Sequence, residues 1–433
     1  MMITVVLRFK GQVNYDRLIT DLQTTVQRFR RLRQRVVIPG KLFHRPYWDD
    51  VPTFKVQDHV ERLNLRLPAD DVSVGELVNQ KMNTALDFTQ PLWKLSLVDN
   101  HPEGSIIIVR IHHCIADGIS LMRVLLQMTH PSTQVDVNQI PMDDPIQEAY
   151  RATLEPAIPK TLVEASSSNS KGTTGRGTVY KTPGFTDIVA AIARIVFRPP
   201  DPPTILKAPL GVVKKAVWSE PFSISEIKKI AEIKQATIND VMMAITSGAI
   251  RRYMDLHNEP SERDIRAFIM VNMRGLAFDD ELGNKFGLVF LTLPLSRVQP
   301  MERLELIKNG MDLLKASAEY AASYIILNIL GQLPEWVEHL ATRILDTKGT
   351  VVATNVPGSR NELFIADAPI QSMVGWVPQS GRVGVGLSYV SYNNQLIVGL
   401  NADAGVIPDP EKLLEFFVQE YRSFQSVLLP HEI

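Results

Sequence analysis

The sequence predicts a two-domain protein of the mixed α/β (α+β) class. Strand-like runs and helix-like stripes are mixed in both halves, without the short, regular strand–helix–strand units of a doubly wound fold. A chain of 433 residues exceeds the usual size of one domain. The segment 164–178 is dominated by Ser, Gly, Thr and Asn and cannot bury enough apolar surface to order itself. We therefore expect an N-terminal domain over 1–160, a flexible linker over 161–185 and a C-terminal domain over 186–433.

The first half of the chain carries two strand signals and two helix signals. Residues 3–9 (ITVVLRF) have the β-branched composition of a strand, and 104–111 (GSIIIVRI) predict a buried one. Residues 15–37 place large apolar side chains on one stripe at helical spacing, and 119–129 (ISLMRVLLQMT) predict a second helix.

The second half begins with helix signals and continues mainly with strands. Ser223 and Glu226 have capping-box spacing at the start of one helix, and a second helix is expected from near Thr237 to 254. Strand-like runs follow at 267–273, 286–295, 385–392 and 395–403.

The composition gives little reason to expect several common partners. The formal net charge is −1, so no excess of basic residues favours nucleic acid. Cys114 is the only cysteine, which excludes an intrachain disulfide and fits a reducing cytosol. No small-residue cleavage site follows the short apolar run at the start, so no signal peptide is expected.

Two segments are unusually apolar, although neither reaches the roughly 18 uninterrupted apolar residues of a spanning helix. They are DIVAAIARIVFRPP (187–200) and YAASYIILNILGQLPEWVEHL (320–340). Two interpretations stay open for them. They are either buried helices or helices that lie on a lipid surface, with Tyr and Trp at the polar margin.

The segment RIHHCIADGIS (110–120) combines two adjacent histidines with an aspartate and a glycine. Because side chains on a strand alternate between its faces, His113 continues the apolar row of the strand, whereas His112 shares its face with Arg110. The apolar row consists of Ile107, Val109 and Ile111. Adjacent strand histidines diverge, and the chain lacks a Cys/His cluster with zinc spacing, so no metal site is expected.

His113 suits the role of a general base. A neutral imidazole can take a hydroxyl proton near physiological pH, and a partly apolar pocket favours the neutral form. Gly118 permits a sharp turn, and Asp117 suits the N-terminus of the next helix, as an anchor instead of a proton acceptor. The alternative for a lone histidine is a satisfied core residue. The whole H-H-x-x-x-D-G string, however, is expected by chance in about one such chain per thousand.

HHCIADG (112–118) resembles the HHxxxDG signature of coenzyme-A-dependent acyltransferases and of peptide-synthetase condensation domains. Four further segments match the motifs of one group, in its order. They are PLWKLSLVDN (91–100), IND (238–240), LGNKFG (282–287) and TNVPGS (354–359). With these five motifs the chain resembles the bifunctional wax ester synthase/diacylglycerol acyltransferase (WS/DGAT) family over nearly its whole length.

The chain departs from the family pattern at two places. Ser359 stands where the last motif usually has proline, and family members usually carry a few dozen residues before the first strand. A missing segment of that kind is expected to weaken substrate binding or folding.

The resemblance implies two chloramphenicol-acetyltransferase-like domains, each a mixed sheet flanked by helices, with a tunnel between them. Long-chain acyl-CoA would enter from one side, and diacylglycerol or a long-chain fatty alcohol from the other. The implied reaction is O-acyl transfer that yields triacylglycerol or wax ester, with a histidine base and no acyl-enzyme. No cofactor is expected, since acyl-CoA is a substrate. The resemblance also implies a cytoplasmic protein that associates peripherally with a membrane or lipid-droplet surface.

The resemblance also assigns roles to residues in the five motifs. The catalytic set would be His113, His112, Asp117 and Asn284. Asn284 either orients the substrate and steadies the oxyanion or is a turn residue, and Arg274 either pairs with Asp117 or lies on the surface. Structural roles are expected for Gly118, Arg274, Asn239 and Asp240, the last as a first-turn helix residue. The residues expected to shape the substrate pocket are Pro91, Leu92, Trp93, Asn355 and Gly358.

Two rival functions stay open. One is a condensation-type domain that uses carrier-protein thioesters, although the chain has no tethered carrier module. The other is a non-catalytic lipid-binding or lipid-droplet protein, and the intact His113 and Asp117 argue against it.

Overall fold

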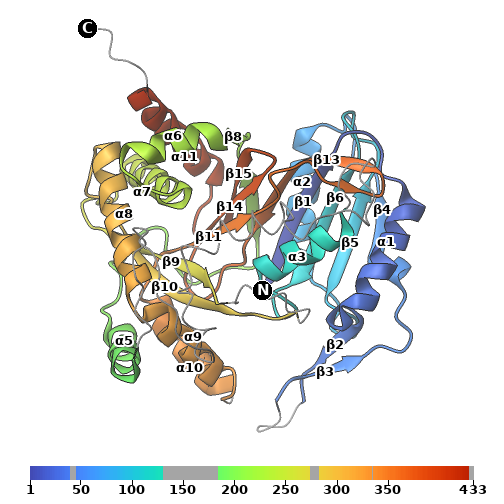
Figure 1. Cartoon of the computed structure of the whole chain (residues 1–433), viewed down its shortest axis with the longest axis horizontal. Helices are drawn as coiled ribbons and strands as arrows, with labels where there is room; N and C mark the ends of the chain where they lie inside the picture. The colour runs from blue at the N-terminus through green and yellow to red at the C-terminus, as the bar shows by residue number, and fades with distance from the viewer. Residues whose placement is uncertain (40–44, 130–183, 274–281, 334, 429–433) are drawn as a thin grey trace, which may run out of the picture.

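The computed structural model describes residues 1–39, 45–129, 184–273, 282–333 and 335–428. Two mixed β-sheets lie next to each other with helices packed on them, which confirms the predicted α/β class (Figure 1). Most of the expected linker, 161–183, and the whole of 130–160 lie outside the described residues. The described helices are α1 (Tyr15–Arg28), α2 (Asp71–Met82), α3 (Gly118–Met128), α5 (Phe185–Phe197), α6 (Ile224–Ile233), α7 (Ile238–Leu256), α8 (Pro300–Ala316), α9 (Glu319–Leu330), α10 (Glu335–Asp346) and α11 (Pro410–Gln425).

The first sheet has the strand order β12-β13-β1-β6-β5-β4. Its strands are β1 (Met2–Phe9), β4 (Val60–Leu63), β5 (Trp93–Val98), β6 (Ile106–His112), β12 (Phe364–Ile365) and β13 (Ala368–Trp376). β1 lies between β6 and β13 and pairs antiparallel with both. The sheet of the N-terminal half therefore includes a segment, 364–376, from the C-terminal half.

The alternation of side chains on β6 separates the two faces of this sheet. Ile107 and Ile111 belong to the core cluster formed with α1 and α3, whereas Ile106 and Ile108 belong to the cluster formed with α2. One face of the central strands therefore carries α1 and α3, and the other carries α2.

The second sheet has the order β10-β9-β11-β14-β15-β7, and β8 also pairs with β15. Its strands are β7 (Lys214–Trp218), β8 (Phe222–Ser223), β9 (Ile265–Asn272), β10 (Phe286–Leu293), β11 (Val351–Pro357), β14 (Val385–Tyr392) and β15 (Gln395–Asp403). Ala267 and Ile269 of β9 pack in the large core with α7 and α11, whereas Phe268 packs with α5 and α9. Helices thus cover both faces of this sheet.

Two helix predictions differ from the structure. The sequence predicts a helix over 15–37, but α1 ends at Arg28. The last four residues of the expected range form a short strand, β2 (Gln34–Val37), which pairs with β3 (Tyr47–Asp50). The two valines at the end of this stretch suit a strand better than a helix. The predicted capping box at α6 is wrong, because Ser223 makes no capping bond and Glu226 accepts hydrogen bonds from α11 instead.

The two apolar segments form α5, and α9 with α10. Within the described residues, no helix is both long enough and apolar enough to cross a membrane.

Candidate active site

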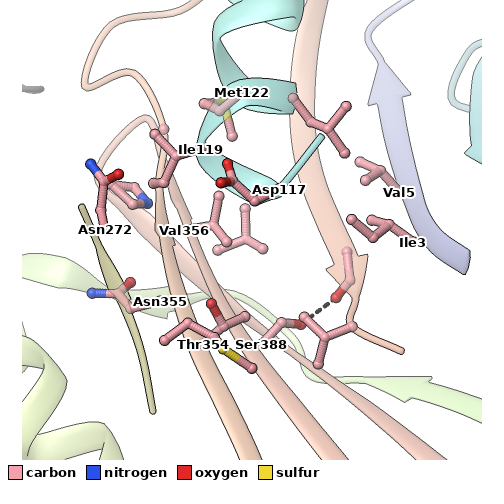
Figure 2. Close-up of a pocket in the computed structure, with 18 of the residues that line it drawn as sticks. Ile3, Val5, Asp117, Ile119, Met122, Asn272, Thr354, Asn355, Val356 and Ser388 are labelled. Atoms are coloured by element: carbon pink, nitrogen blue, oxygen red, sulfur yellow. Dashed lines mark hydrogen bonds between the residues drawn. The ribbon is translucent and has the colours of Figure 1, made fainter. Parts of the chain in front are cut away.

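A cavity of about 1000 Å³ lies between the two sheets. The first sheet contributes Ile3 and Val5 of β1 to the lining. It also contributes the apolar row of β6 that is predicted to share a face with His113: Ile107, Val109 and Ile111. β1 and β6 pair so that these residues lie opposite one another, Ile3 with Ile111 and Val5 with Val109. Figure 2 shows Ile3 and Val5 on one side of the cavity, Asn272 and Asn355 of the second sheet on the other, and Asp117 between them.

His113 lines this cavity, immediately beyond the end of β6. Its main-chain N–H donates to the carbonyl of Met1. Its ring is held by Asn284, whose Oδ1 lies 3.1 Å from Nδ1 of His113. Asn284 Nδ2 donates to the carbonyl oxygen of the same histidine at 2.9 Å, which fixes the orientation of the carboxamide.

This double contact selects one tautomer of His113. A carboxamide oxygen only accepts hydrogen bonds, so Nδ1 of His113 must carry the proton that it donates to Asn284. The neutral ring therefore carries its lone pair on Nε2. Burial lowers the pKa of His113, against the opposing effects of the Asp117 charge and the Asn284 hydrogen bond. The ring is consequently neutral at neutral pH and able to accept a proton.

Asp117 is a structural anchor that joins two motifs from different halves of the chain. It is the N-cap of α3, where Oδ1 accepts from the N–H of Ser120 at 3.0 Å. Oδ2 accepts from the N–H of Lys285 at 2.9 Å, and the N–H of Asp117 donates to the carbonyl of Gly283. These bonds hold the L-G-N loop against the histidine turn and so place Asn284 on His113. Arg274, the expected partner of Asp117, lies outside the described residues.

His112 is not part of the cavity lining, contrary to its expected place in the catalytic set. Its ring lies on the opposite side of the strand, with Nδ1 2.9 Å from Sγ of Cys114 and Nε2 3.0 Å from the amino nitrogen of Met1. Burial, with the charges of that amino group and of His113, lowers the pKa of His112 to about 4. Burial raises the pKa of the Cys114 thiol to about 11, so this thiol stays protonated and is a poor nucleophile.

The remaining motif residues divide into lining and supporting positions. Asn239, Trp93, Asn355, Gly118 and Gly358 line the cavity. Pro91 and Leu92 do not; they are buried beside it, and the carbonyl of Leu92 accepts from the N–H of His112. Asp240 closes a capping box with Thr237 at the start of α7, as a first-turn residue.

Ser359, which replaces the usual proline, is buried and fits its turn. Its Oγ accepts from the N–H of Asn361 at 3.0 Å, and its carbonyl accepts from the N–H of Asn393. Gly358 is required here, because a Cβ at this position would lie 2.4 Å from the carbonyl oxygen of Ser391. The serine therefore stabilises the turn by a local side-chain hydrogen bond in place of a proline ring.

The sequence did not single out several other lining residues. Asn272, Thr354 and Ser388 bring polar side chains to the second-sheet side, and the ring of Phe286 packs edge-on against His113 with 6.1 Å between centroids. Phe286 follows directly after the Asn284–Lys285 pair, so its proximity to the L-G-N motif was the available signal.

The lining extends from the core of the N-terminal half to α9 and α10. At the first end it is apolar and comes from α1, α3, β5 and β6, including Leu18, Leu22, Val26, Leu95 and Leu125. At the other end it includes Leu327 of α9 and Glu338, Thr342 and Leu345 of α10. His113 lies in the N-terminal half of the chain, and its bonds to Asn284, together with the Asp117–Lys285 bond, join it to the C-terminal half.

Comparison with known proteins points to one family. A family model described as the wax ester synthase/diacylglycerol acyltransferase catalytic domain matches residues 3–242, and one described as the WS/DGAT C-terminal domain matches 282–425. The O-acyltransferase WSD of Acinetobacter baylyi is 23% identical in an alignment that covers 96% of this chain and 91% of that protein.

Two solved structures share the fold. The wax ester synthase/diacylglycerol acyltransferase from Marinobacter aquaeolei VT8 matches with a TM-score of 0.67 and 18% identity over 98% of this chain and 94% of its own. The first condensation domain of the calcium-dependent antibiotic synthetase matches with a TM-score of 0.62 and 15% identity over 98% and 90%. The fold is thus that of two-domain acyltransferases and condensation domains.

Proposed function

The chain belongs to the wax ester synthase/diacylglycerol acyltransferase family and is an acyltransferase, and we propose that it transfers a long-chain acyl group from acyl-CoA to a lipid hydroxyl. The acceptor is diacylglycerol, a long-chain fatty alcohol or both. The observation that carries this proposal is the neutral His113 at the wall of a largely apolar cavity, with Nδ1 bound to Asn284 and Nε2 left as the base.

The proposed chemistry needs one base and no covalent enzyme intermediate. Nε2 of His113 takes the proton of the acceptor hydroxyl while the hydroxyl oxygen attacks the carbonyl carbon of the thioester. The tetrahedral oxyanion then collapses, the carbon–sulfur bond breaks, and the thiolate of CoA receives the proton from Nε2. The proton and the acyl group are thereby both accounted for, and His113 returns to its starting state.

Asn284 is a positioning residue in this mechanism. Both ends of its carboxamide are engaged by His113, so its expected role on the substrate or the oxyanion is replaced by one on the base. When His113 becomes cationic, the Nδ1–H bond to Asn284 stays in place and keeps the ring aimed. Asp117 supports the same geometry through its bonds to Ser120 and Lys285.

The shape of the cavity suits two lipid substrates. Its apolar end within the core of the N-terminal half offers room for one long chain, and the end at α9 and α10 offers room for a second. We propose that the protein is cytoplasmic and meets its lipid substrates by peripheral association with a membrane or lipid droplet. The proposed reaction uses no cofactor besides the acyl-CoA substrate.

The reaction is tested by release of the CoA thiol from palmitoyl-CoA with hexadecanol, monooleoylglycerol or dioleoylglycerol as acceptor. The wild type is expected to release thiol and form the matching ester. Palmitoyl-CoA should be preferred over palmitoyl-carrier protein, and the reverse preference would favour a condensation-type enzyme. A single-turnover reaction with labelled palmitoyl-CoA should leave no label on acid-precipitated protein, since stable protein-bound acyl would contradict direct transfer.

A further inference from the structure

Helices α5, α9 and α10 lie together at one end of the second sheet (Figure 1). All three expose large apolar side chains. We call this surface the α5–α10 face. It consists of Phe185, Val189, Val196 and Phe197 of α5, Ile329 of α9, Leu333 just after α9, and Trp336, Leu340 and Ile344 of α10. Phe185 and Phe197 are 82% and 83% exposed and Trp336 is 65% exposed, which is costly for such large side chains in water.

α10 exposes a row of large apolar side chains on its outer side. Trp336, Leu340 and Ile344 recur every four residues and are exposed. Leu345 of the same helix lines the cavity together with Glu338 and Thr342, so α10 has apolar side chains on both sides. A helix that serves only the core of its own domain does not also carry a row of large apolar side chains on its outer side. This orientation therefore indicates an external apolar partner.

α5 is fixed in place by polar contacts, so its exposed side chains do not result from loose packing. The ammonium of Lys348, which is 3% exposed, donates to the carbonyls of Ile195, Val196 and Arg198 at the C-terminal end of α5. Arg198 donates to both carboxylate oxygens of Glu319 at 2.9 and 3.0 Å, at the start of α9. These bonds hold the inner side of α5 on the sheet and leave its outer side apolar and exposed.

We propose that the α5–α10 face docks on a lipid surface and opens the cavity toward it. The choice of a lipid partner rests on the proposed function, whose acceptors are poorly soluble in water. It also rests on continuity, because α9 and α10 carry both the face and one end of the cavity lining. A substrate that leaves a lipid layer at this face reaches the cavity without crossing water.

The charges around the face specify the kind of lipid surface. α5 carries one acidic and one basic residue, Asp187 and Arg194, and α10 carries three acidic residues and Arg343, so basic groups are not in excess beside the face. Such a margin is not selective for anionic lipid. The face therefore binds zwitterionic and neutral lipid surfaces through apolar contact, and its binding is insensitive to salt.

Vesicle flotation tests the proposal. The vesicles consist of phosphatidylcholine with about 10 mol% dioleoylglycerol, a composition in which the bilayer stays intact. The variant Phe185→Ser/Phe197→Ser/Trp336→Ser is expected to lose about a hundredfold in vesicle affinity. The matched control Val72→Ser/Val212→Ser/Leu256→Ser removes exposed apolar side chains elsewhere and should bind as the wild type does. Wild-type binding should be the same in low and high salt and with added phosphatidylserine.

Two further readouts keep docking separate from catalysis. The face variant should retain turnover with hexanoyl-CoA and butan-1-ol, which are dissolved as monomers, and lose turnover of vesicle-embedded dioleoylglycerol. His113→Ala should bind vesicles normally, so a failure of the proposed reaction would show in turnover alone. A face variant that floats like the wild type would overturn the proposal. So would a wild type that does not float but forms a dimer that the face variant abolishes, since the occupant would then be a second copy.

Discussion

His112 and His113 are neighbours in the chain and reach opposite environments. His113 faces the cavity, keeps Nε2 free and is aimed by Asn284, whereas His112 faces the other side of the strand and contacts Cys114. Burial lowers the pKa of both rings, so both are neutral at pH 7. What separates them is therefore access to substrate, and not their charge at this pH. The alternation of one strand is enough to separate a base from a supporting residue.

The strongest test of this comparison removes each ring in turn. His113→Ala is expected to lower kcat about a thousandfold, because it removes the only base proposed for the acceptor hydroxyl. His112→Ala should lower kcat by less than about tenfold, since it touches no substrate. Initial rates of thiol release from palmitoyl-CoA measure both variants, with thermal unfolding as a check on folding. Equal losses in the two variants would erase the distinction.

Changing Asn284 sharpens the comparison, because this residue contacts only His113 of the two rings. Asn284→Leu is expected to lower kcat about ten- to a hundredfold, with little change in KM, as the ring loses its alignment. Asn284→Asp places a carboxylate at Nδ1, raises the pKa of His113 and moves the acid limb of the pH–rate profile to higher pH. An unchanged pH–rate profile in Asn284→Asp would contradict the claim that residue 284 acts through His113.

Asp117 should affect stability as well as rate. Asp117→Ala removes the N-cap of α3 and the bond to Lys285, so we expect the free energy of unfolding to fall by about 1–2 kcal/mol. The kcat should fall less than in His113→Ala, because Asp117 acts through the placement of Asn284. Urea denaturation and steady-state rates measure the two effects. A normal unfolding midpoint combined with a loss as large as that of His113→Ala would instead make Asp117 a direct participant.

The smallest effect is expected at Cys114. Cys114→Ser removes a thiol whose raised pKa keeps it protonated at neutral pH, so turnover should stay within about twofold of the wild type. Alkylating reagents at pH 7.5 should likewise react slowly. Rapid inactivation that Cys114→Ser prevents would indicate a thiolate near the reacting groups.

Local patterns predicted the strands and the inward row of the active strand well. The runs 385–392 and 395–403 coincide with β14 and β15, and His113 does share the cavity with Ile107, Val109 and Ile111. These features depend on β-branched composition and on a period of two, both of which are local.

Pairings between distant parts of the chain could not be predicted from the sequence. Nothing local indicates that β12 and β13 join the first sheet, or that Asn284 contacts a ring 171 positions earlier in the chain. The sequence assigned Asn284 to the oxyanion or to a turn because its partner could not be seen. The outward stripe of α10 also required the structure, since periodicity alone does not say which way an apolar stripe faces.

The pH dependence of kcat/KM for the wild type tests the central claim most directly, with palmitoyl-CoA and a soluble alcohol as substrates. His113 acts only when neutral, so activity is present above its pKa in the free enzyme and falls as the pH drops through that value. Because burial lowers this pKa, the acid limb should lie below 6.5, the ordinary value for histidine, and should be absent from the residual activity of His113→Ala. An acid limb at or above 6.5, or one that persists in His113→Ala, would contradict a buried, neutral His113 as the base.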